Sequence, residues 1–124
     1  MRDFAAVLQQ ANEDFEFSRE MRYYTGKLHV AIGDQAWLAD YEDGRLLSVG
    51  PAGTAPQDAA IAISGTREQW EEMTAERPRP FFQSLQSSSI KHGVQLSNTD
   101  QLYARLPALN RLMQIFRQLN AQGA

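Results

Sequence analysis

The chain contains no cysteine and only two histidines among its 124 residues. Disulfide bonds, thiolate catalysis and cysteine-based zinc sites are therefore excluded, and a histidine-rich metal site is not available. Other chemical motifs are missing as well, since there is no glycine-rich phosphate loop, no nucleophile elbow and no His-Glu metal motif. The sequence thus predicts no catalytic residue, no metal and no cofactor.

Long apolar runs and a basic excess are also missing. No stretch reaches the ~18 apolar residues of a membrane span, and acidic residues such as Asp3 and Glu13 interrupt the N-terminal segment where a signal peptide would be apolar. We therefore expect a cytoplasmic protein without stable membrane insertion. The 12 Lys and Arg residues against 15 Asp and Glu give a formal net charge of −3. Because nucleic acids favour basic surfaces, no nucleic-acid partner is expected.

What the chain does contain is the composition of a globular domain. Hydrophobic residues make up 43% of the sequence and charged residues 22%. Both fractions are ordinary for a folded protein, and the length suits one domain with one core. We therefore predict a single domain over residues 1–124.

Alternating hydrophobic residues predict five short strands. Leu28, Val30 and Ile32 alternate with smaller or more polar residues, which is typical of a half-buried strand. His29 falls on the opposite, solvent-facing phase of that strand. The other strands are expected over residues 36–40, 46–49, 59–63 and 90–96, with a hairpin turn at Glu42-Asp43-Gly44-Arg45.

Capping residues and helical spacing predict the helices. A first helix capped by Asp3 is expected to reach about residue 14, and Thr66 with Gln69 forms a capping box for a second. A short helix is expected over residues 81–86, followed by a serine linker. The last helix, capped by Asn98 or Thr99, carries an apolar stripe at helical spacing formed by Leu102, Leu106, Leu109, Met113 and Phe116. Pro107 lies inside this run and should kink it or start a second helix after a short break.

The sequence leaves several roles open for the polar residue His92. It shares its strand phase with Ile90, Val94 and Leu96, so the alternation predicts that it points into the core or into a cavity. A satisfied core histidine, a polar anchor for a ligand and a general base all remain possible interpretations. The large adaptable side chains, such as Met73 and Met113, suit either a filled core or a plastic apolar pocket.

The order of elements resembles the sterol carrier protein type 2 family. The resemblance spans about residues 20–116. It is carried by these features: the hairpin over residues 28–50 with Trp37 and Asp43-Gly44, the segment Ile61-Ala62-Ile63-Ser64-Gly65-Thr66, then Trp70, Pro80, residues 90–96 and the Leu-rich helix. The chain departs from the family pattern at Ser97-Asn98, where the family usually has Gly-Asp. A serine run also replaces the family's glycine before the last strand.

This resemblance implies an α+β fold, with helices covering one face of a five-stranded, mostly antiparallel sheet and a long C-terminal helix. It also implies non-enzymatic binding of a lipid, fatty acid or acyl chain in an internal apolar tunnel, in a stand-alone member of bacterial type. By position, the residues that would line or border the tunnel are Trp70, Met73, Phe81, Phe82, Leu85, Val94, Leu106, Leu109, Met113 and Phe116. The strand alternation described above adds His92 to this candidate ligand-binding set, as a polar anchor. The last helix would form the movable wall of the tunnel, with Pro107 as its hinge.

Two alternatives remain at this point. The chain could be a small α+β enzyme or isomerase in which His92 acts as a base beside a carboxylate such as Asp40. It could also be an interaction module whose last helix docks on another protein or on a second copy, which would give a homodimer.

Overall fold

The computed structural model describes residues 1–122 of the chain. Its five strands form one sheet in the order β3-β2-β1-β4-β5. The strands are β1 (Gly26–Ile32), β2 (Gln35–Glu42), β3 (Arg45–Ala52), β4 (Ile61–Gly65) and β5 (Gln95–Leu96). Strands β1 and β4 run parallel, whereas the other three neighbouring pairs are antiparallel. The mixed sheet confirms the predicted α+β, mostly antiparallel architecture.

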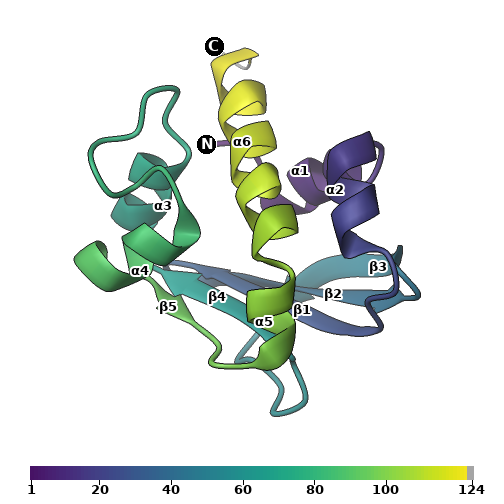
Figure 1. Cartoon of the computed structure of the whole chain (residues 1–124). Coiled ribbons are helices and arrows are strands. Elements are labelled where there is room, and N and C mark those ends of the chain that lie inside the picture. Colours follow the sequence, from purple (N-terminus) through teal and green to yellow (C-terminus); the bar gives the residue numbers. More distant parts are fainter. Residues whose placement is uncertain (123–124) are drawn as a thin grey trace.

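Six helices accompany the sheet in the described part of the chain. They are α1 (Phe4–Ala11), α2 (Phe15–Met21), α3 (Arg67–Met73), α4 (Leu85–His92), α5 (Asp100–Ala104) and α6 (Leu106–Gln122). Helices α1, α2, α3 and α6 stand on one face of the sheet, and the loop between β3 and β4 lies below the opposite face (Figure 1). Within residues 1–122, no helix has the length and apolar character needed to cross a membrane.

The core lies between the sheet and the helices. Leu28, Val30 and Ile32 on β1 and Ile61 and Ile63 on β4 are all buried there, because alternate strand residues point to the same face. Burying each side chain of this size stabilises the fold by roughly 1.5–3 kcal/mol. Helix α6 packs over these buried strand residues. It stands between α3 and α1 (Figure 1).

The helix breaks follow the local capping signals. Asp3, Thr66 and Thr99 each accept a hydrogen bond from the backbone three residues on, and the capping box of Thr66 is complete. The last helical run is interrupted at Arg105, which caps α5, and Pro107 lies in the first turn of α6. A proline is tolerated there because the first turn needs no N–H donor. The predicted short break is therefore confirmed.

The prediction for residues 81–96 is wrong. A helix, α4, occupies residues 85–92, where the sequence suggested a serine linker and the start of a strand, and the strand shrinks to Gln95–Leu96. The hydroxyl of Ser84 caps this helix by accepting from the backbone N–H of Ser87, and Gly93 ends it at a φ of 78°. The apolar alternation over residues 90–96 therefore ran from the end of helix α4, across Gly93, into strand β5, and was mistaken for a single strand.

Smaller differences concern the element ends. The first predicted helix is two helices, because Asp14 accepts from the backbone of Phe17 and caps α2 separately. Strand β3 continues to Ala52, and β4 begins at Ile61 rather than at residue 59. The hairpin turn is confirmed, with positive φ at both Asp43 and Gly44.

Asp14 also joins α2 to α6. The Arg111 guanidinium donates to both carboxylate oxygens of Asp14, at 3.0 and 2.8 Å, and the two side chains are 22% and 23% exposed. The Arg111 hydrogen bond, together with the backbone N–H of Phe17, lowers the pKa of Asp14 to about 2. The pair is bidentate, which is the geometry in which a guanidinium and a carboxylate bind most strongly.

We predict that Arg111→Gln destabilises the protein by about 1–2 kcal/mol at pH 7, allowing for partial exposure of the pair. The folded-state pKa of Asp14 is lowered from 3.8, so its stabilisation is complete above pH 4 and is lost as the pH falls towards 2. Urea unfolding of both proteins across this pH range measures the difference. Arg19→Gln is the control, because the Arg19 side chain is 49% exposed and forms a single-contact ion pair with Glu20 at 3.3 Å. A difference that persists unchanged at pH 2 would contradict the assignment.

Candidate functional site

Most of the predicted tunnel residues lie together in one apolar core. Those at most 1% exposed are Trp70, Met73, Leu85, Val94, Leu109, Met113 and Phe116. Phe82 is buried and Leu106 is half-buried against this core. Two members lie outside it, since Phe81 is 50% exposed and His92 is half-buried at the edge of the core, beside Phe82. The structure therefore brings together nine of the eleven predicted residues without testing whether they bind a ligand.

Three aromatic rings form the centre of this core. The ring centroids of Trp70, Phe116 and Phe4 are each 6.4 Å from the other two. The indole N–H of Trp70 donates to the carbonyl of Ala31 on β1 at 3.0 Å, which fixes the orientation of the ring. The sequence analysis placed Phe4 on a helix but not in the site, because nothing local shows which helices meet.

The prediction placed His92 in the core or in a cavity, and the structure places it in an open surface pocket, which it lines with Glu72 and Phe82, rather than in the core. Its ring stacks on Phe82 with the centroids 3.7 Å apart and an interplanar angle of 5°. Its Nε2 lies 3.0 Å from the Pro80 carbonyl oxygen, to which it can donate. Asp40, the carboxylate suggested as its partner, instead forms an ion pair with Lys27 at 2.8 Å and lines a different pocket.

Helix α4 forms a wall of the core that is attached by few buried side chains. It buries only Leu85 and Ser88, and the latter satisfies its own hydroxyl within the local turn. Asn110 on α6 holds the first turn of α4 by accepting from the backbone N–H of Leu85 at 2.9 Å and donating to Gln86 at 2.9 Å. A helix with few buried apolar groups opens at low cost.

Arg117 on α6 holds the neighbouring segment over the same side of the core. Its guanidinium donates to the carbonyl oxygens of Met73 at 2.7 Å, Phe82 at 3.3 Å and Gln83 at 3.0 Å. Burial lowers the pKa of Arg117. The contacts fasten the end of α3 and the start of α4 to the same helix.

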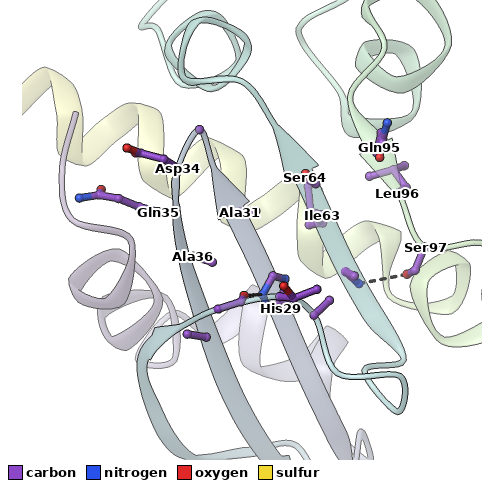
Figure 2. Close-up of a pocket in the computed structure, with 16 residues that line it drawn as sticks. His29, Ala31, Asp34, Gln35, Ala36, Ile63, Ser64, Gln95, Leu96 and Ser97 are labelled. Atoms are coloured by element: carbon purple, nitrogen blue, oxygen red, sulfur yellow. Dashed lines mark hydrogen bonds between the residues drawn. The ribbon is translucent and has the colours of Figure 1, made fainter.

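The opposite face of the sheet holds a pocket of about 520 Å³. His29 lies in it under the loop that follows β3, and its Nε2 is 2.8 Å from the carbonyl oxygen of Gly53 (Figure 2). The residue is 4% exposed, so the prediction of a surface histidine is wrong. The alternation along β1 correctly placed His29 on the face away from the core. The loop after β3 covers His29 there, and no sequence pattern shows where that loop packs. No group of three or more candidate metal ligands occurs among residues 1–122.

Comparison with known structures identifies the fold. The crystal structure of sterol carrier protein 2 matches with a TM-score of 0.70 and 19% identity, over 93% of this chain and 94% of that one. The solution structure of a conserved hypothetical protein from Thermus thermophilus, described as possibly a sterol carrier protein, matches at 0.68 and 19%, over 94% and 85%. A UbiJ-SCP2 ubiquinone synthesis protein matches at 0.51 and 12%, over 89% and 94%. No protein-family model and no curated protein matches the sequence. The chain therefore has a sterol carrier protein 2-like fold.

We predict that Arg117→Met loosens residues 74–84 selectively. Three carbonyl oxygens lose their donor, so the free energy of unfolding should fall by about 1–3 kcal/mol. Amide hydrogen exchange in this segment should accelerate more than in the sheet. Arg79→Met is the matched control, because the Arg79 side chain is 69% exposed and binds Glu72 and the face of the Phe82 ring but none of the three carbonyl oxygens. Uniform acceleration across the chain would show that Arg117 has no local role.

Proposed function

We propose that this protein binds and carries an apolar small molecule, a fatty acid, an acyl chain or another lipid, without catalysing a reaction. The site is the space between the sheet and helices α3, α4 and α6. The observation that carries the proposal is the gathering of nine of the eleven predicted lining residues into one continuous apolar core of a sterol carrier protein 2-like fold. Met73 and Met113 support it further, because unbranched thioether side chains can repack around a ligand.

The core is closed in this structure, so a ligand requires one wall to move. Helix α4 fits this role because its contacts with the core are few and its first turn depends on Asn110. Two exposed apolar side chains, Phe81 at 50% and Ile90 at 79% exposure, lie beside it and on it. They provide apolar surface at the point where a ligand would arrive.

Helix α6 is less suited to be the moving wall. Leu109, Met113 and Phe116 are at most 1% exposed, and displacing α6 would uncover all of them. Its polar residues also bind α2, α3 and α4, as described above. We therefore assign the movement to α4 and leave α6 as the fixed wall. The same burial leaves the apolar face of α6 unavailable for docking on a partner in this conformation.

We predict saturable binding of the fluorescent fatty acid cis-parinaric acid and its displacement by palmitate. In Trp37→Phe, which leaves Trp70 as the only tryptophan, the bound polyene should quench the indole by energy transfer because Trp70 lies in the proposed site. Absence of saturable binding would contradict the proposed function.

The movement of α4 can be tested separately, because the chain has no native cysteine. A short bis-maleimide linking Gln86→Cys to Asn110→Cys should slow fatty-acid uptake at least tenfold relative to the same variant without the crosslink, since these side chains join α4 to α6. The same reagent across Lys27→Cys and Asp40→Cys, which face each other on β1 and β2, is the control. Unchanged uptake after the first crosslink would contradict α4 as the moving wall but not lipid binding.

A further inference from the structure

The face of the sheet that the helices leave open carries a row of small side chains. Ala52 on β3, Ala36 on β2 and Ala31 on β1 are direct register neighbours, and Ser64 on β4 continues the row. Ala62 on β4 lies next to the row, beside His29. All of these residues except His29 present a methyl or hydroxymethyl group, so they form the floor of a trough across the strands (Figure 2).

This composition is unusual for an open sheet face. Such faces normally carry polar or β-branched residues, and alanine is disfavoured in strands. The strand alanines that line the pocket therefore contribute little to the sheet itself, but they allow a flat molecule to approach the backbone closely. The pocket of about 520 Å³ lies within the ~300–1,000 Å³ typical of small-molecule sites.

His29 supplies a second, independent observation. A carbonyl oxygen only accepts hydrogen bonds, so the Nε2 that faces Gly53 carries the hydrogen, and Nδ1 of the neutral ring is an acceptor. Within residues 1–122, Nδ1 has no hydrogen-bond partner. Of the buried side-chain polar atoms described, only Arg105 Nε is both unpartnered and sealed from solvent. The free nitrogen of His29 therefore keeps its solvent contact through the pocket that this residue lines.

We propose that the trough is a second binding site, for a small planar molecule that carries a hydrogen-bond donor such as a phenolic hydroxyl. The ring would lie on the methyl groups of Ala31, Ala36 and Ala62, and its hydroxyl would donate to Nδ1 of His29. The lining contains no lysine or arginine and includes the carboxylate of Asp34, which favours a neutral ligand over an anion. This site does not depend on the proposed lipid site, because the sheet separates the two.

The test compares 2-naphthol with 2-methoxynaphthalene, which has the same rings but no donor. Titrations followed by amide chemical shifts should place 2-naphthol at residues 29, 31, 36 and 62, with about tenfold tighter binding than its methyl ether, the contribution of one hydrogen bond. In His29→Phe this preference should disappear, whatever happens to the absolute affinity. Ala36→Leu should weaken 2-naphthol at least tenfold by filling the trough. Ser48→Leu adds a leucine on the same face outside the trough and should have no effect.

Three results would overturn the proposal. One is a shift pattern confined to the helical side, around Trp70 and Met113, which would instead indicate binding in the proposed lipid site. Another is equal affinity for the two naphthalenes in the unmodified protein. The third is a dimer in sedimentation equilibrium that Ala36→Leu disrupts, which would assign the trough to a second copy of the chain.

Discussion

The burial of one face of α6 is the constraint on which the rest of the structure depends. Its apolar residues close the core against the sheet, and its polar residues bind the surrounding segments. Arg111 holds the start of α2 and Asn110 holds the start of α4. Arg117 and Asn120 hold the end of α3 through the carbonyls of Met73 and Thr74. One helix thus fixes the position of three others, none of which is longer than eight residues. Helices this short are marginal alone and need such tertiary anchors.

This arrangement distributes stability unevenly, and the uneven distribution suits a carrier. Moving α6 would uncover the largest buried side chains, whereas moving α4 would uncover little beyond Leu85. A closed apolar core with one weakly held wall can admit a ligand at the cost of a few local contacts. The same core with every wall equally anchored would have to unfold to open.

The predictions from sequence succeeded where the signal was local. The capping box of Thr66 and the turn at Asp43-Gly44 depend on residues at most three positions apart in the chain, and both are confirmed. The apolar stripe of α6 was recognised because its period is sustained over many turns. The strand predicted at residues 90–96 was correct only at Gln95 and Leu96, because four alternating positions do not distinguish a strand from the end of a helix. The glycine at position 93, with its φ of 78°, ended the helix within that pattern.

The two histidines show why the sites were harder to predict than the fold. The alternation along β1 placed His29 correctly on the open face of the sheet, but the loop that follows β3 covers it and leaves it buried. His92 was expected in the core or in a cavity as a strand residue, whereas it ends helix α4 and lines a surface pocket. Burial depends on which distant segment covers a residue, and spacing does not encode that. Ala31 has contacts on both sides of the sheet. Its methyl group lines the trough, and its carbonyl oxygen accepts a hydrogen bond from the Trp70 indole. Residue Trp70, 39 positions along the chain, therefore helps to hold β1, which a pattern read along one strand does not reveal.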